Sequence, residues 1–503
     1  MSITAADRPN VQLRGPYDSL RDYVAALEAM GRLVRIEEMD QDRFEATAFA
    51  YRLIEKHGFY GAPAFLIERI KVDGEWLDGP VISNLYGGWD TEAMSFGVEE
   101  VTTDQNQMYQ ATLSKLASQT DDNGQFNKIK PVTIKHEHSP CKEVIVTGDD
   151  VNILQYPWLQ SNPGDAGRYI NAASIIMEDP DLGRNVSTQR FQVKSRNKVG
   201  VNLEGFQHGG FLLMAAKRRG EKTAKAAIVM GVDPIIFSLS SSKIAKLGED
   251  ELELAGGLKG KPVELVKCET NDIMVPAHAE MILEGEIPLD DKEEEGPFAE
   301  IYGYMGMKVP NNYYMNIVAV THRRNPWFIN SFAGVTKLHH AMPSATSDYL
   351  KHKRMIPSLV AYYTPREATG IAILSVKKRI SGVGMTAGLQ AAASGFLAKV
   401  IIVVDEDVDI FDLHKVLHAV GSRWQPNDAS LIIPKMAAMP LDPSSPIRGL
   451  TSKIIIDATK QFPEEGGPPS WPAVSRQLLE EACPQLFDLI DSKWDEYWKD
   501  FEQ

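Results

Sequence analysis

Short runs of alternating or β-branched residues dominate the central part of the chain, from about residue 131 to about residue 328. Turn-forming residues separate these runs, which include PVTIKHEH, EVIVTG, INAASIIME, NVSTQRFQV, PVELVKC and YYMNIVAVTHRR. Runs of this kind are typical of antiparallel strands. The pattern therefore predicts a mostly antiparallel sheet or barrel over 131–328, with helical interruptions at 209–219 and 240–254.

The sequence on the amino-terminal side of this region predicts an α/β domain over residues 1–130. Asp18 and Ser19 can cap a helix that ends at Gly31, and a strand at 32–37 follows at once. The other elements predicted in this domain are a helix at 44–56 and strands at 64–70 and 81–85.

An α/β pattern returns on the carboxy-terminal side and predicts a further domain over 329–462. Its predicted elements are helices at 344–354, 386–397 and 412–419 and strands within 368–378 and 398–412. The Pro/Gly-rich segment 462–472 is a linker. Residues 463–503 are therefore expected to form this linker and a closing amphipathic helix at 474–501. Its apolar positions, which predict packing on another domain or subunit, are Leu478, Leu479, Leu486, Leu489, Ile490, Trp494, Tyr497 and Trp498.

Charge and cysteine content limit the partners and the compartment. The 53 Lys and Arg against 68 Asp and Glu give a net charge of −15, which argues against binding to nucleic acid or to an anionic membrane. The three cysteines are far apart without a C-x-x-C pair, and the amino terminus lacks an apolar signal segment. The longest apolar stretch, 400–404, is far short of the ~20 residues that span a bilayer. We expect a cytoplasmic protein.

One segment of the C-terminal domain has the pattern of a dinucleotide-binding unit. A strand at 371–376, the glycine loop GVGMTAG and a strand that ends at Asp405 follow one another. An NAD-dependent oxidoreductase using 371–405 is therefore an alternative function. The spacing is G-x-G-x-x-x-G, however, and three basic residues precede the first glycine, so a plain βαβ crossover also fits. The acidic cluster Asp405, Glu406, Asp407 and Asp409 lacks the spacing of a calcium loop and is expected to be solvated.

Two groups of residues in the middle domain indicate chemistry. Asn185, His208 and Glu251 offer an amide oxygen, an imidazole and a carboxylate, a mixed set that suits Mn²⁺ or Mg²⁺. Glu295 and Glu300 flank a Gly-Pro turn beside apolar residues, where a raised pKa would make a glutamic acid a usable proton donor. Arg190 could pair with one of them and hold the two in different protonation states. Ordinary turn and surface-loop residues remain the alternative in both cases.

Taken together, these segments resemble the UbiD-type family of reversible decarboxylases, which includes ferulic acid and hydroxybenzoate-type members. The resemblance covers most of the chain and is strongest from about 140 to 330. The stretches that carry it, in order, are RNVSTQR, FQH, ELELAGGLKGKPVELVKCETND, AEMILEGEI and EGPFAEIYGY, with VDEDVDIFD further on.

The resemblance implies prenylated FMN, supplied by a separate flavin prenyltransferase and bound in a split β-barrel. It implies that Asn185, His208 and Glu251 hold Mn²⁺ (or Mg²⁺) and the cofactor phosphate, with K⁺ near Ser238–Ser241. It further implies a covalent adduct between substrate and cofactor, loss of CO₂, and proton delivery by Glu300 within an Arg190–Glu295–Glu300 network. The cofactor-binding residues implied are Asn185, Ser187, Thr188, Gln189, Arg190, Gln207, His208 and Glu251.

The resemblance also implies an oligomer, a homodimer or homohexamer formed through the C-terminal domain, with the closing helix reaching over a neighbour. The chain departs from the ferulate-type members at Ala393 or Ser394, where they have a lysine that reaches the flavin. The pocket wall opposite the flavin is expected at 327–342, where the side chains suit an aromatic acid. The candidate substrates are hydroxybenzoates, fused or heteroaromatic acids such as a phenazine carboxylate, and aryl-CoA acids. The expected pocket residues are Ile301, Phe332, Leu338, His339 and His340.

Overall fold

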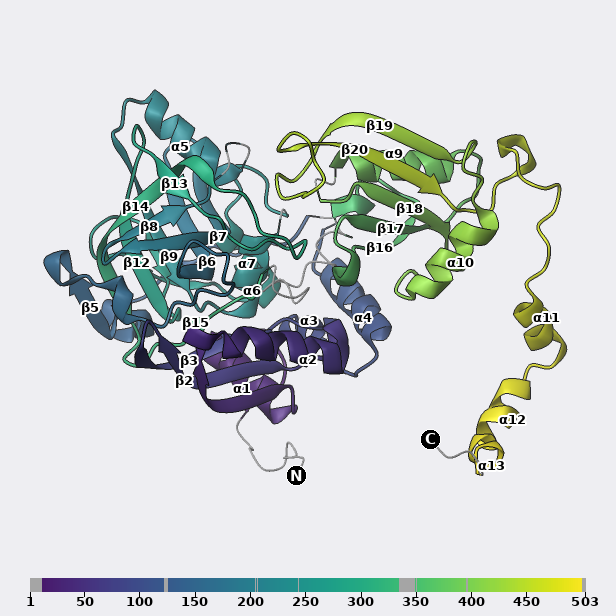
Figure 1. Cartoon of the computed structure of the whole chain (residues 1–503), viewed down its shortest axis with the longest axis horizontal. Helices are drawn as coiled ribbons and strands as arrows, with labels where there is room; N and C mark the ends of the chain where they lie inside the picture. The colour runs from purple at the N-terminus through teal and green to yellow at the C-terminus, as the bar shows by residue number, and fades with distance from the viewer. Residues whose placement is uncertain are drawn as a thin grey trace.

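The computed structural model of the chain describes residues 11–121, 125–203, 205, 207–242, 244–333, 349, 351–394 and 397–499. The pocket residues expected at 338–340 and most of the helix predicted at 344–354 lie outside this part. The β-rich middle domain and the C-terminal domain lie side by side, and the N-terminal domain packs along the middle domain (Figure 1).

The N-terminal domain is an α/β layer whose first helix begins where the sequence predicts. The side chain of Ser19 accepts from the backbone N–H of Asp22, and the Asp22 carboxylate accepts from the N–H of Ser19, so a capping box begins α1. A four-stranded sheet of order β1-β2-β3-β15 follows, with β1 parallel to β2. The elements are α1 (Leu20–Ala29), β1 (Leu33–Asp40), α2 (Glu45–Gly61), β2 (Ala64–Val72), β3 (Glu75–Ser83), α3 (Trp89–Ser95), α4 (Gln105–Ala117) and β15 (Phe328–Ile329).

The middle domain contains a closed six-stranded antiparallel barrel, as expected from the alternating runs. Its strands pair in the cycle β6-β7-β8-β14-β12-β9 and back to β6. They are β6 (Tyr169–Asp179), β7 (Gly183–Ser195), β8 (Lys198–Val201), β9 (Thr223–Met230), β12 (Met281–Pro288) and β14 (Val309–His322). Short strands flank the barrel: β4 (Val132–Thr133), β5 (Val144–Thr147), β10 (Glu264–Lys267), β11 (Met274–Pro276) and β13 (Glu293–Glu295).

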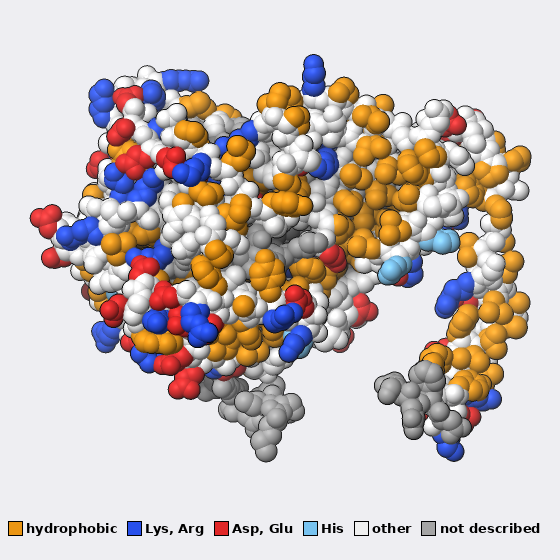
Figure 2. Space-filling model, in the orientation of Figure 1, with side chains coloured by type: hydrophobic (Ala, Val, Ile, Leu, Met, Phe, Trp, Pro, Cys, Tyr) orange, Lys and Arg blue, Asp and Glu red, His pale blue; other side chains and the backbone are white. Residues whose placement is uncertain are grey.

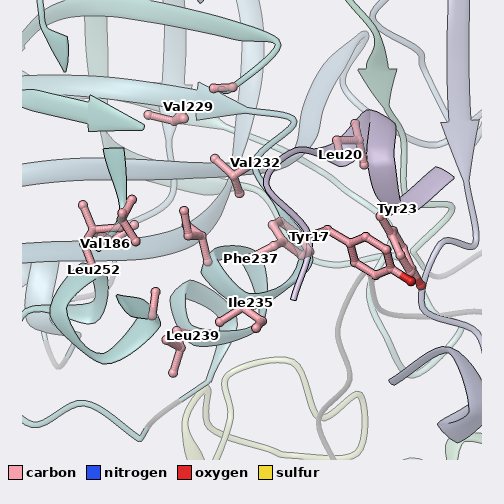
Figure 3. Packing of buried hydrophobic residues seen from close by; sticks show 14 of the residues in the cluster. Tyr17, Leu20, Tyr23, Val186, Val229, Val232, Ile235, Phe237, Leu239 and Leu252 are labelled. Carbon is pink, nitrogen blue, oxygen red and sulfur yellow. The ribbon is translucent and has the colours of Figure 1, made fainter. Parts of the chain in front are cut away.

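Three helices cover the barrel: α5 (His208–Arg218), α6 (Pro234–Ser241) and α7 (Glu251–Lys259). The single helix predicted at 240–254 is wrong. Asp233 caps α6, and Asp250 caps α7 by accepting from the N–H of Leu252, so a new helix begins at Glu251. Residues of α6 and α7 join α1 and the barrel strands in one hydrophobic cluster, where Tyr17 lies between Phe237 of α6 and Tyr23 of α1 (Figure 3).

The C-terminal domain is a five-stranded sheet of order β16-β17-β18-β20-β19, in which β17, β18 and β20 are parallel. An aromatic cluster joins it to α3 and α4, and the Tyr60 and Tyr363 hydroxyls are 2.8 Å apart. Its elements are β16 (Leu359–Tyr363), β17 (Ile371–Val376), α9 (Val383–Ser394), β18 (Val400–Asp405), α10 (Leu413–Arg423), β19 (Ser430–Ala437) and β20 (Leu450–Asp457).

The tail is not the single helix predicted at 474–501. It forms three short helices, α11 (Ser475–Ala482), α12 (Leu486–Ser492) and α13 (Trp494–Tyr497). Pro484 causes the first break, because a proline disfavours helical geometry in the residue before it, and Cys483 has φ −139°. The tail stands away from the body, and Trp494 is 50% exposed (Figures 1 and 2). Across the described residues, no helix combines the length and apolar character needed to cross a membrane.

Candidate active site

Arg190, on β7, binds both predicted carboxylates. Its Nε and Nη2 donate to the two carboxylate oxygens of Glu295 at 3.1 and 3.0 Å, and its Nη1 donates to Glu300. Tyr169 of β6 adds a third donor to Glu295, at 3.3 Å. All three charged side chains are largely shielded from solvent. One arginine therefore links two acids that come from separate turns of the chain.

The local fold explains how the two acids converge. Glu295 ends β13, and Gly296, at φ +80°, turns the chain back toward the barrel. Residues 298–306, which we call the Glu300 hairpin, then form a tight loop. In this loop the N–H of Glu300 donates to the carbonyl of Tyr304 at 2.9 Å, and the N–H of Gly306 donates to that of Phe298 at 2.8 Å. The Glu300 carboxyl is thereby fixed beside Arg190.

The surroundings of Glu300 favour its protonated form. Burial raises its pKa above the ordinary value, against the opposing effect of Arg190. The ring of Phe298 lies 5.1 Å from the Arg190 guanidinium and 4.4 Å from the Tyr169 ring, which makes one side of the site apolar. An acid with a raised pKa, held in a fixed position by an arginine, is better suited to proton donation than an ordinary exposed glutamate.

The three expected metal ligands lie on three elements that meet at β7. Glu251 begins α7, and its carboxylate accepts from the N–H of Val186 at 2.9 Å, next to Asn185. His208 begins α5, whose Gly209 packs near the Asn185 amide. Burial raises the pKa of Glu251 to about 8, so its charge is poorly balanced by the protein. Among the described residues, no three His, Cys, Asp or Glu side chains are placed so that they alone could hold a metal ion. Two features suit these residues to a divalent cation bound together with a phosphate: their oxygen and nitrogen donors, and the Glu251 carboxylate, whose negative charge the protein balances poorly.

Hydroxyl and amide groups line β7 beside this set. Thr188 Oγ1 lies 2.6 Å from Ser241 Oγ and 2.9 Å from Ser240 Oγ. Gln189 donates to Gln207 at 3.1 Å, and Asn185 donates to Ser187 at 3.2 Å. These side chains belong to the expected cofactor-binding set, and the two serines lie in the segment expected to be near K⁺. Thr188 of β7 and the two serines at the end of α6 are thus in direct hydrogen-bond contact.

Comparison with known proteins adds independent information at this point. Three family models match the chain in succession: the N-terminal domain, the Rift-related domain and the C-terminal domain of 3-octaprenyl-4-hydroxybenzoate carboxy-lyase, UbiD, over residues 24–109, 132–336 and 338–458. The chain belongs to the UbiD family. It is an enzyme of the carboxy-lyase class, with the α/β, barrel and α/β arrangement of that family.

The relatives align with nearly the whole of this UbiD-family chain. A phenolic acid decarboxylase of Bacillus subtilis is 31% identical, over 94% of this chain and 99% of the relative. HmfF from Pelotomaculum thermopropionicum, a UbiD-class enzyme solved with FMN, is 30% identical with a TM-score of 0.76, over 91% and 97%. An evolved dimeric form of HmfF was solved with prFMN. Vanillic acid decarboxylase of Sedimentibacter hydroxybenzoicus, in a closed form, is 28% identical with a TM-score of 0.79, over 94% and 99%.

The dinucleotide alternative is not supported in this UbiD-family chain. A Cβ at Gly384 would lie 2.3 Å from the Asp457 carboxylate, and one at Gly388 would lie 2.4 Å from Ile455, so both glycines allow α9 to pack on β20. Where a pyrophosphate would bind, Glu465 accepts from the N–H of Gly382 at 2.6 Å. Asp405, the residue expected to bind a ribose, pairs with Arg423 at 2.9 Å.

The expected pocket residues lie in different surroundings. Ile301 is half-buried in the Glu300 hairpin, whereas Phe332 is 1% exposed and stacks on Phe65 at 6.0 Å, a position in the core. The sequence reasoning missed Tyr169 and Asp165. Asp165 accepts from the N–H of Ala299 at 2.8 Å and so supports the Glu300 hairpin from outside the barrel. No local pattern distinguishes either residue, because both act through contacts more than 120 residues away along the chain.

Proposed function

We propose that this enzyme catalyses the reversible, non-oxidative decarboxylation of an aromatic carboxylic acid with prenylated FMN and Mn²⁺ (or Mg²⁺), with K⁺ nearby. The observation that carries the proposal is the buried pair of acids, Glu295 and Glu300, held by one arginine, with burial raising the pKa of Glu300 above its ordinary value. Related proteins named as phenolic and vanillic acid decarboxylases support the substrate class.

The cofactor, when bound, supplies the electron sink that breaking the bond to the carboxylate carbon requires. Asn185, His208 and Glu251 would hold the metal and the phosphate. Arg190 orients the substrate carboxylate, and Glu295 keeps Arg190 in place through its paired hydrogen bonds. The apolar side chain of Phe298 helps to exclude water from the site.

Glu300 completes the reaction by placing a proton on the carbon that has lost CO₂. The bond between that carbon and the carboxylate breaks, CO₂ leaves, and a C–H bond forms with the proton from the Glu300 carboxyl. Water then returns a proton to Glu300, so no oxidant or reductant is consumed. The reverse sequence, with Glu300 accepting the proton, would carboxylate the aromatic ring.

Co-production with a flavin prenyltransferase tests the proposal. We expect the purified protein to retain prenylated FMN, identified by its mass, and to release CO₂ from members of a panel of phenolic, fused and heteroaromatic acids. Protein that is handled without oxygen and never retains flavin, or that carries the cofactor and releases no CO₂ from any acid, would contradict it.

A further inference from the structure

The Glu300 hairpin reaches out of the barrel domain and contacts the C-terminal domain. The hydroxyl of Tyr302 donates to the carbonyl of Leu397 at 2.9 Å. Its ring lies so close to Gly370 that a Cβ there would be 3.2 Å from Cε1. Thr369 Oγ1 also donates to the carbonyl of Ile301 at 3.5 Å. Tyr302 therefore inserts at the amino ends of β17 and β18, at the edge of the sheet opposite the glycine loop of α9.

The C-terminal domain holds this contact firmly from its own side. The backbone N–H groups of Lys399 and Val400 donate to the carbonyl of Gly370 at 2.9 and 3.1 Å. The Lys399 ammonium binds both carboxylate oxygens of Asp442, at 2.9 and 3.1 Å. Burial, and then the negative charge of Asp442, raise the pKa of Tyr302 to about 12. Tyr302 is therefore a neutral phenol next to this ion pair.

Asp442 belongs to the loop that joins β19 to β20, and this loop points from the C-terminal domain toward the barrel (Figure 1). The N–H of Ala438 donates to the carbonyl of Gly449 at 3.0 Å and closes the base of the loop. Arg448 lies at this base, and its positive charge is the last of the influences on the pKa of Glu300, after burial, Arg190 and Glu295; it lowers that pKa.

We propose that Tyr302 is a positioning residue: it holds the Glu300 hairpin against the C-terminal domain, so that the Glu300 carboxyl stays beside Arg190 of the barrel. This inference rests on the proposed function of Glu300. Tyr302 acts through Glu300 and takes no part in proton transfer.

The proposal predicts the direction of a pH effect. The charged groups that act on the pKa of Glu300 are Arg190 from β7, Glu295 from β13 and, last, Arg448 from the β19–β20 loop. Removing the Arg448 charge takes away one of the two charges that lower this pKa; Arg190 still lowers it, and burial and Glu295 still raise it, so the pKa of Glu300 rises. Since a proton donor is needed, kcat/KM falls as pH rises through that pKa. The alkaline limb of the profile then moves to higher pH.

The test compares variants of the full-length enzyme loaded with cofactor: Tyr302→Phe, Tyr302→Ala, Arg448→Gln and the Tyr302→Ala/Arg448→Gln pair. Tyr304→Ala is the matched control, because Tyr304 is in the same hairpin and 64% exposed.

We expect Tyr302→Ala to lower kcat about tenfold to a hundredfold, as a small displacement of a catalytic group does, with little change in KM or flavin content. Tyr302→Phe should have a smaller effect. Tyr302→Ala and Arg448→Gln should each move the alkaline limb upward, and the double variant should move it no further.

The proposal is overturned if Tyr302→Ala keeps the wild-type kcat and pH profile, if Tyr304→Ala loses as much activity, or if the two shifts add. Hydrogen–deuterium exchange of residues 298–306 gives a readout that does not depend on turnover. Exchange should be faster in Tyr302→Ala than in Tyr304→Ala, and equal exchange would exclude the contact. Failure of the wild-type enzyme to release CO₂ would instead contradict the proposed function and leave this readout to decide the contact.

Discussion

Two glycine-containing segments, EGPFAE at 295–300 and GVGMTAG at 382–388, both resemble functional sites in sequence, and the fold treats them differently. The first brings acids from two turns against an arginine from a distant strand, in buried surroundings that shift the pKa of Glu300. The second allows a helix to pack closely on a strand, and the N–H of its first glycine, Gly382, is already bound by Glu465. A glycine loop thus indicates a ligand only where the amides that it exposes have no partner in the protein.

Removing the proton donor should have the largest effect. Glu300→Gln keeps the shape of the side chain but cannot donate an acidic proton, so we expect CO₂ release to fall by about 10² to 10⁴-fold. Cofactor content, measured by absorbance and mass, should be unchanged. Glu294→Gln is the control, since Glu294 is exposed and pairs with Lys308. Full activity in Glu300→Gln would remove the proposed role of Glu300.

Metal binding should depend on pH through Glu251. The pKa of Glu251 is about 8 in the folded protein and about 4.3 in an unfolded chain. The protonated form of Glu251 therefore stabilises the fold at pH 4, and this stabilisation is lost as pH rises to 8. Mn²⁺ would neutralise the carboxylate and should raise the thermal midpoint more at pH 8 than at pH 5.5.

The matched variants for this experiment lie on one helix. Glu251→Gln should raise the midpoint of the metal-free protein at pH 8 and abolish the response to Mn²⁺, whereas Glu253→Gln, two residues further along α7, should leave the response in place. An equal Mn²⁺ response in the wild type and in Glu251→Gln would exclude Glu251 as a ligand.

The glycines of the C-terminal unit should matter for stability rather than for a nucleotide. Gly384→Ala would force a methyl group against Asp457, and we expect a loss of about 1–3 kcal/mol in the free energy of unfolding. Gly421→Ala, in α10 with no atom within 4 Å of the new methyl group, is the control and should not destabilise the protein. A rise in the thermal midpoint with NAD⁺ that Gly384→Ala abolishes would restore the oxidoreductase alternative.

Sequence patterns predicted the elements whose determinants are local. The capping box at Ser19 defines α1, and alternation within the central runs predicted the barrel strands β6, β7 and β14. The single helix predicted at 240–254 failed because an apolar spacing does not reveal that Asp250 begins a separate helix. In the tail, the effect of Pro484 outweighed a continuous apolar pattern.

The site itself depends on closure of the barrel. Arg190 and Glu295 are 105 residues apart, and only the pairing of β7, β8, β14 and β13 brings them together. The resemblance to a family identified these two residues and Glu300 as a set. It could not reveal Tyr169 or Asp165, because their contacts arise from tertiary packing without a recurring local motif.

The last prediction separates assembly from chemistry, and its effect on activity should be the smallest. The tail carries exposed Leu478, Trp494 and Tyr497, and exposed apolar residues such as Ile432 also lie on the C-terminal domain, where Figure 2 shows many hydrophobic side chains. We propose that the tail packs on a second copy of the chain in a homodimer or homohexamer.

Truncation after Ala473 keeps the hydrogen bond from Trp471 to Gln461 and should shift the mass in solution toward the monomer. CO₂ release per chain should stay within about twofold of wild type, since the proposed chemistry lies in the barrel. An unchanged mass would exclude the tail as the contact, and a large loss of activity would mean that the partner contributes to the site.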